Sequence, residues 1–319
     1  MHLLRPALVL TPLLALASAC AQTESPIEDL ETTDRAGCRG CVWGPPVLNT
    51  NVVNGAPLPS IDTSGKKWDG VTVYEVSIGA DPTDVLTDVS TSEGVLHGIG
   101  VSGAEYSGHD FIGSVWILHD HRFGFGPVET TLRVADFIED GPRSRYKFTY
   151  ESYLTEGVAL PTCEADEQGS YAAVLFQDLH VEPDGTLTNR PDTLYFGCSS
   201  GAVGKAVTWG YSPWEFSQEV HQTAVRAVRG DYCGDGVSWT AAGTPLLVDD
   251  PFGLNGFGGA LNSTEGLWTE NGVACLDVPR LAQWSYEDIQ CPDHEIPRCE
   301  PTDDLWTYPG TWLWTKPAF

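Results

Sequence analysis

Alternating apolar and polar residues form a series of short runs in the chain before Cys198. Each run is bounded by Gly, Asp or Pro residues of the kind found in turns, and no helical periodicity separates the runs. They cover residues 71–78, 95–101, 110–118, 130–137, 146–153, 172–176 and 193–196. This pattern predicts antiparallel strands, which we expect to form a β-sandwich or an open barrel within residues 44–198.

The hydrophobic pattern changes after Cys198 to the spacing of a helix. Ser212, Pro213 and Glu215 have the residue types of a helix cap, a first helical position and a capping partner. We therefore predict a main helix over residues 213–229, which Gly230 would end. Its apolar residues recur three and four positions apart: Phe216, Val220, Ala224, Ala227 and Val228.

Helices and loops are predicted to dominate residues 199–319. A short helix is expected over residues 200–207, and the capping pattern at Ser285 predicts the start of another. The predicted fold class is therefore α+β. An antiparallel β-rich N-terminal part would precede a disulfide-stapled, helical and loop-rich C-terminal part.

Residues 1–19 have the layout of a bacterial signal peptide, with a weakly basic start, an apolar core and small residues before Cys20. The sequence around Cys20 resembles a lipobox, which implies an acylated Cys20 at the mature N-terminus. Acyl chains would then anchor the protein in a bilayer. Ala21, where retained lipoproteins have aspartate, implies an outer membrane lipoprotein that faces the periplasm or the cell surface. The alternative is an ordinary secretory signal with an incidental cysteine. Residues 20–43 would be an acidic tether.

Eight further cysteines form an even set, which predicts disulfides in an exported chain. The connectivity stays open, although the natural grouping joins Cys163 to Cys198, Cys38 to Cys41, and the last four cysteines among themselves. The CxxC spacing of Cys38 and Cys41 has no second ligand pair for zinc and no βαβ pattern for a thioredoxin-like site. The eight residues are Cys38, Cys41, Cys163, Cys198, Cys233, Cys275, Cys291 and Cys299.

The net charge narrows the range of partners. The chain has 17 basic and 44 acidic residues and a formal net charge of −27. Such a surface repels phosphate backbones, so we expect no nucleic-acid partner. The membrane would be reached through the lipid anchor, and a protein or glycan partner remains unidentified.

One segment carries a family resemblance. Residues 229–236 read RGDYCGDG, which resembles the signature of the bacterial ADYC domain, a family of exported proteins. Gly230 stands where the family name has alanine. Ala206 and Ala224 stand where cysteines are expected in relatives, which implies that one disulfide is missing here. The resemblance implies no assigned activity. Further matching segments are 197–201 (GCSSG), 209–214 (WGYSPW), 221–222, 243–245 (GTP) and 272–276 (GVACL), with looser matches at 107–113 and 161–163.

Two groups of residues suggest an alternative function as an envelope hydrolase. Residues 197–201 fit the G-x-S-x-G nucleophile elbow with Ser199 as the nucleophile, and Asp249 and His294 follow in the order acid, histidine. The antiparallel strands before Ser199 argue against that fold. His119 and His121 would lie on one face of a strand and could share a metal, although the sequence identifies no third ligand.

A calcium site is a further alternative, because Asp231 and Asp235 have the spacing of a calcium loop. The EF-hand pattern fails at Cys233 and Ala242, so a looser Ca²⁺ site or a plain turn remains. Otherwise no cofactor is expected.

Other polar and aromatic residues have a structural and a functional interpretation. His221 could act as a general base, but a buried histidine that bonds a backbone carbonyl is the simpler interpretation. Trp306, Trp312 and Trp314 could stack on a glycan or dock the C-terminal tail.

The leading hypothesis is a non-enzymatic binding or structural module of the cell envelope. The residues that carry the family resemblance are mainly glycines, aromatic residues and cysteines, which specify turns, packing and bridges. No combination of acid, base and nucleophile stands out, so no catalytic residue is predicted.

Overall fold

A computed structural model describes residues 48–317, except 59, 66–69, 80–82, 123–125, 152–156, 242, 257–263, 302 and 305–306. The predicted signal peptide, the tether and Cys20, Cys38 and Cys41 lie outside the described residues, as does Trp306. No helix in the described part of the chain is long and apolar enough to cross a membrane.

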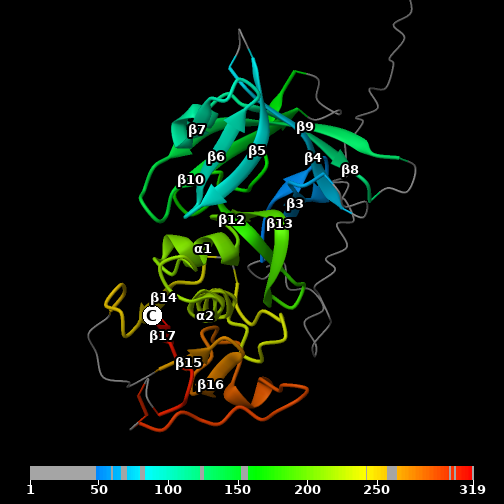
Figure 1. Ribbon diagram of the computed structural model, residues 1–319. Coiled ribbons are helices and arrows are strands. Elements are labelled where there is room, and N and C mark those ends of the chain that lie inside the picture. The colour runs from blue at the N-terminus through cyan, green and yellow to red at the C-terminus, as the bar shows by residue number, and fades with distance from the viewer. Residues whose placement is uncertain are drawn as a thin grey trace, which may run out of the picture.

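The strands before Cys198 close into a barrel of seven strands, in the order β3-β13-β12-β10-β9-β8-β4 (Figure 1). The barrel closes because β4 pairs with β3 in parallel at Thr72 and Asp62, whereas the other pairings are antiparallel. The barrel strands are β3 (Ser60–Asp62), β4 (Val71–Ile78), β8 (Val115–Asp120), β9 (Val128–Ile138), β10 (Arg145–Glu151), β12 (Ala172–Val181) and β13 (Leu187–Cys198).

Shorter elements extend this barrel at its edges. β5, β6 and β7 continue the sheet outward from β4, and β11 pairs with β10. A separate hairpin is formed by β1 and β2. These elements are β1 (Val52–Val53), β2 (Ala56–Pro57), β5 (Asp84–Ser92), β6 (Val95–Gly100), β7 (Glu105–Ser107), the 3-10 turn η1 (Gly108–Phe111) and β11 (Ala159–Pro161).

The chain after Cys198 forms two helices and a small sheet. The helices lie between the barrel and this sheet, whose strand order is β14-β17-β15-β16 (Figure 1). The elements are α1 (Ala202–Thr208), α2 (Gln218–Arg229), β14 (Leu246–Asp249), β15 (Gly266–Thr269), β16 (Gly272–Leu276), the 3-10 turn η2 (Tyr286–Asp288) and β17 (Leu313–Pro317).

Two hydrophobic cores share the strands β12 and β13. Leu175 and Phe196 face into the barrel, where they pack with Trp116 and other buried residues. Their sequence neighbours Val174 and Tyr195 face outward and pack against the helices. This follows from the alternation of side chains along a strand, and it means that both faces of this strand pair are buried.

The predicted α+β fold class is wrong. Strand makes up 42% of the described residues and helix 12%, and the described part of the C-terminal region contains a four-stranded sheet beside its two helices. The barrel is closed rather than open or a sandwich. Both errors have one cause: β3 has three residues and the C-terminal strands have four or five, and the partners of such short strands are set by tertiary packing rather than by local periodicity.

The main helix begins at Gln218, five residues after the predicted start at residue 213. Ser217 caps it, because its Oγ accepts the backbone N–H of Val220 at 3.3 Å. The Ser212 hydroxyl bonds the Glu215 carboxylate at 3.1 Å, but within a preceding turn. The end of the helix is confirmed, since Gly230 adopts the left-handed conformation at φ 61°.

The other predicted helices have different outcomes. The short helix expected over residues 200–207 is confirmed as α1. The capping pattern at Ser285 begins only the 3-10 turn η2, so the helix predicted there is wrong.

Three disulfides occur in the described residues. Cys163 bonds Cys198, which confirms the predicted pair and ties the end of β13 to the segment after β11. The last four cysteines pair among themselves, as predicted, as Cys233–Cys291 and Cys275–Cys299.

Candidate functional site

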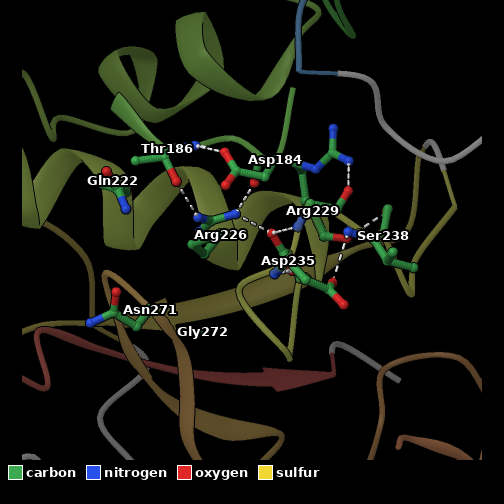
Figure 2. A network of polar contacts seen from close by, with 12 residues as sticks. Asp184, Thr186, Gln222, Arg226, Arg229, Asp235, Ser238, Asn271 and Gly272 are labelled. Carbon is green, nitrogen blue, oxygen red and sulfur yellow. Dashed lines mark hydrogen bonds and ion pairs between the residues drawn. The ribbon is translucent and has the colours of Figure 1, made fainter. Parts of the chain in front are cut away.

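The signature segment, residues 229–236, begins at the last residue of α2 and is buried except for Gly234 and Asp235, which are half-buried. Within the last turn, Arg226 points toward the β12–β13 connection, as Figure 2 shows. Its guanidinium donates to the carboxylate of Asp231 at 2.5 Å, to the carbonyl of Asp184 and to Thr186 Oγ1 at 3.3 Å. It also donates to the carbonyl of Glu270 in the β15–β16 turn. One side chain therefore links three segments that are distant in sequence.

Asp231 is the acceptor at the centre of this network. Its two carboxylate oxygens receive Arg226 and the backbone N–H groups of Asp235 at 3.1 Å and Gly236 at 3.0 Å. Arg229 donates to the carbonyl of Gly236, and its own carbonyl accepts the Ser238 hydroxyl at 2.6 Å. The turn is thus held by side chain to backbone bonds, which stabilise a buried loop.

The glycines of the signature segment permit close backbone packing. A Cβ built on Gly234 would overlap the carbonyl of Asn271, and one on Gly236 would lie 2.6 Å from Cα of Asp184. Both residues also have positive φ, 69° and 83°. At these two glycines the signature segment therefore packs directly against both neighbouring turns.

A second buried network fastens the segment to the small sheet. Glu265 accepts the Tyr232 hydroxyl and the Arg280 Nε–H, each at 2.7 Å, and the Thr315 hydroxyl at 2.8 Å. Arg280 also donates to the carbonyls of Ala227 and Val228 at the end of α2. Burial raises the pKa of the Tyr232 phenol, and the Glu265 carboxylate adds to the effect.

These contacts leave Asp231 and Asp235 little capacity for calcium. The Asp231 oxygens bind Arg226 and two backbone N–H groups, and Asp235 Oδ1 accepts the N–H of Val237. Within the described ranges, no group of three or more His, Cys, Asp and Glu side chains could hold a metal ion. The signature segment has the contacts of a structural junction.

A polar cleft lies elsewhere, beside α1. Its cavity volume is about 890 Å³. Ser199 and Trp209 come from the two ends of the α1 segment, and Glu164 comes from the connection after β11. Thr240 and residues 243–245 also line it. Three of the segments that carry the family resemblance, 197–201, 209–214 and 243–245, therefore contribute to one cleft.

Two buried hydroxyl groups in this cleft lack a partner within the described part of the chain. The side chains of Ser199 and Thr240 are 2% and 7% exposed, and neither Oγ atom has a hydrogen-bond partner there. A buried polar group without a partner costs free energy unless water or a ligand satisfies it. Both residues line the cleft, and each of these hydroxyl groups can donate and accept a hydrogen bond.

Each of the three cations that line the cleft lies against a carboxylate. Lys205 bonds the Glu167 carboxylate, and Arg145 lies 3.9 Å from that of Asp140. Arg280, which also lines the cleft, is paired with Glu265. Hydrogen bonding from Lys205 lowers the pKa of Glu167 even though burial opposes it. The cleft therefore offers polar surface without a concentrated positive or negative charge.

Ser199 does not meet the other residues of the hydrolase hypothesis here. No histidine is among the described residues that line the cleft. Asp249 lies in β14, paired with Trp314, and His294 lies in an exposed loop. Cys198, inside the proposed elbow, is fully buried in its disulfide.

His119 and His121 lie together on the outer side of the barrel, as strand alternation predicts. Their ring centroids are 6.2 Å apart, and the ring of Tyr74 stacks on His119 at 4.3 Å. Asp120, between them, faces inward and is 8% exposed. Nε2 of His121 lies 3.2 Å from Thr72 Oγ1.

The interpretation of His221 as a buried structural histidine is confirmed. Its Nδ1 lies 2.7 Å from the carbonyl of Tyr211, and the side chain has no exposure. Burial lowers the pKa of His221 to about 4. The ring is thus neutral at ordinary pH and holds the turn before α2 against the helix.

The two described C-terminal tryptophans pack against the protein. The ring of Trp312 stacks on Phe252 with centroids 6.0 Å apart, and Trp314 packs beside Leu267. Both remain half-buried. These contacts hold the C-terminal strand against the protein, as the docking interpretation of these tryptophans expects.

Sequence reasoning missed Thr240 and Glu164 as parts of a site. They come from segments that are more than seventy residues apart, and neither belongs to a pattern with known chemistry. The family resemblance singled out three of the segments that line the cleft. It did not show that they meet, because their convergence depends on the tertiary fold.

A family model matches the part of the chain that contains the signature segment. The family model described as the ADYC domain matches residues 108–282, which is more than half of the chain. No curated protein and no solved structure matches the chain. The strands β3 and β4, which complete the barrel, lie before the matched residues. The chain belongs to the ADYC domain family.

Proposed function

We propose that this chain is a non-enzymatic binding module of the cell envelope, anchored through an acylated Cys20, and that its ligand occupies the polar cleft beside α1. One observation carries the proposal. The hydroxyl groups of Ser199 and Thr240 are buried in the cleft wall without partners in the described residues. A ligand with hydroxyl or amide groups would satisfy both.

The chemistry of the wall favours a neutral, polyhydroxylated ligand, which in an envelope is a saccharide. Each cation of the cleft lies against a carboxylate, which would compete with an anionic ligand. Trp209 offers an aromatic surface against which a sugar ring can pack. The volume lies in the range that is typical of small-molecule sites.

The test is titration calorimetry of the purified mature protein with neutral monosaccharides, disaccharides and N-acetylated amino sugars. Ser199→Ala and Thr240→Val should each weaken binding by about tenfold or less, since each removes one neutral hydrogen bond. Thr131→Val, on the outer side of β9, is the matched control and should bind normally. If no sugar in the panel binds, the saccharide proposal fails.

The hydrolase alternative has its own outcome in the same experiment. Incubation with p-nitrophenyl acetate measures ester cleavage directly. Turnover that Ser199→Ala abolishes and Thr131→Val preserves would replace the binding module with an enzyme.

The anchor is tested separately, by the intact mass of protein purified from the membrane fraction. An acylated N-terminal Cys20 is expected, and Cys20→Ala should release the protein from the membrane. An unacylated N-terminus produced by ordinary signal cleavage would contradict the anchor and leave the cleft proposal untouched.

A further inference from the structure

The interior of the barrel is filled by aromatic side chains along part of its length. Along β8, Trp116, Leu118 and Asp120 all face inward by strand alternation. The Trp116 ring packs edge-on against Phe148 at 5.9 Å, and Phe148 contacts Phe196 at 4.8 Å. Beyond Leu118 no aromatic ring belongs to the described lining, and a cavity opens there.

This barrel cavity has a volume of about 370 Å³ and lies between β4, β8, β9 and the β1–β2 hairpin. Its walls are mostly aliphatic side chains, which favour an apolar occupant. The lining consists of Val53, Leu58, Val71, Leu118 and Val128 with Ala56 and Gly55, and of the polar residues Asn54, Asp120, Arg122 and Thr130.

The two charged residues of the described lining, Asp120 and Arg122, bind each other. Arg122 donates through Nε to Asp120 Oδ1 at 2.9 Å and through Nη2 to Oδ2 at 2.6 Å, which is a bidentate geometry. Its Nη1 donates to the carbonyl of Pro57 at 2.7 Å. Burial would raise the pKa of Asp120, but the bonds from Arg122 outweigh it and lower the pKa. The pair therefore stays ionised and neutral overall.

Asn54 supplies an acceptor that the described residues leave unused. It occupies the β1–β2 turn at φ 51°, a conformation that asparagine tolerates. Its Oδ1 is buried and has no hydrogen-bond partner in the described part of the chain. A buried acceptor without a partner costs free energy, and a ligand in the cavity that donates a hydrogen bond to it would remove that cost.

We propose that the barrel cavity binds a neutral, largely apolar small molecule that carries one hydrogen-bond donor, and that Asn54 Oδ1 accepts that donor. The aliphatic walls bind the apolar body, and the closed Asp120–Arg122 pair gives no partner to a ligand with net charge. This proposal is independent of the polar cleft, because the two cavities share no lining residue.

The probe for the experiment is N-phenyl-1-naphthylamine, which is neutral and apolar and has a single N–H donor. Its fluorescence should rise on titration into the mature protein, and 1-decanol should displace it. Val128→Trp fills the cavity and should abolish the rise. Glu129→Trp places the same ring on the outer side of β9 and is the matched control, which should bind as the wild type does.

A second pair of variants tests the hydrogen bond. Asn54→Gly keeps the positive φ and removes the acceptor, so the dissociation constant should rise about five- to tenfold. Asn54→Asp retains an oxygen acceptor and tolerates the same φ, and it should bind more tightly than Asn54→Gly. This pair remains informative if Val128→Trp does not fold.

Either of two results would overturn the proposal. One is a fluorescence rise that Val128→Trp leaves unchanged, since the probe would then bind elsewhere. The other is the absence of any rise with folded wild-type protein. Equal affinities of wild type, Asn54→Gly and Asn54→Asp would remove Asn54 from the site.

Discussion

Arg226 and Asp231 form an ion pair in which both side chains are almost fully buried, with exposures of 2% and 0% and Nη1 2.5 Å from Oδ2. Arg226 lies in the last turn of α2 and Asp231 in the signature segment after it, so the pair fixes how the chain leaves the helix. Removal of one partner destabilises the folded protein, because it leaves the other charge buried without a counter-charge.

Asp231→Asn should therefore destabilise the protein by about 3–5 kcal/mol. It leaves the Arg226 guanidinium buried without its counter-charge. Urea unfolding followed by tryptophan fluorescence measures the change. Glu151→Gln removes the partner of an exposed pair with Arg133, 3.7 Å apart, and should have little effect. Equal stabilities of the two variants would contradict a structural role for Asp231.

Gly234→Ala should be more damaging than Gly243→Ala. Both glycines have positive φ, 69° and 77°, so both substitutions impose similar backbone strain. At Gly234 the added Cβ also overlaps the carbonyl of Asn271, whereas at Gly243 nothing lies within 4 Å. Melting temperatures of the two variants separate the effect of the contact from that of the strain. If the two melting temperatures fall equally, the packing explanation is wrong.

Stability should fall below neutral pH because of His221. Burial lowers its pKa from the ordinary 6.5 to about 4, so between these values the unfolded chain takes up a proton that the folded protein does not. The free energy of unfolding therefore falls by up to about 3 kcal/mol as the pH drops from 6.5 to 4.

A variant isolates this contribution. His221→Gln can still donate to the Tyr211 carbonyl but does not titrate, so its stability should depend less on pH in this window. His97→Gln, on the exposed side of β6, should follow the wild type. Parallel pH curves for His221→Gln and wild type would refute the assignment.

The disulfide pairs are predicted to appear on peptide mapping without reduction. Linked peptides should contain Cys163 with Cys198, Cys233 with Cys291 and Cys275 with Cys299. Replacing Cys163 and Cys198 together by alanine should cost about 2–4 kcal/mol of stability. Any linked peptide that joins Cys163 to a C-terminal cysteine would contradict the fold.

Local chemistry made some elements predictable. The run at 71–78 became β4 with the same bounds, and Gly230 ended α2 as its conformational freedom suggests. β5 was missed because Asp84, Asp88 and several Thr and Ser residues weaken its alternation. The run at 110–118 was only half right, since η1 and a turn precede β8 at Val115.

Closure of the barrel and convergence of the cleft were beyond sequence reasoning for a common reason. The closing contact joins Asp62 to Thr72 and involves a strand of three residues. The cleft is lined by both Ser199 and Thr240, which are 41 residues apart in sequence. Neither juxtaposition leaves a periodic signal in the chain, because each depends on how finished elements pack. The prediction that Ser212 caps the main helix was wrong, because Ser217 caps it instead.

The shared strands β12 and β13 set a lower limit on the size of a folded fragment. All seven barrel strands precede residue 199, so a chain cut at that point would retain every strand pairing of the barrel. It would nevertheless turn Val174, Phe176 and Tyr195 into a solvent-facing hydrophobic stripe. Such a fragment would associate with itself, so the barrel needs the helices after Cys198 to cover this stripe.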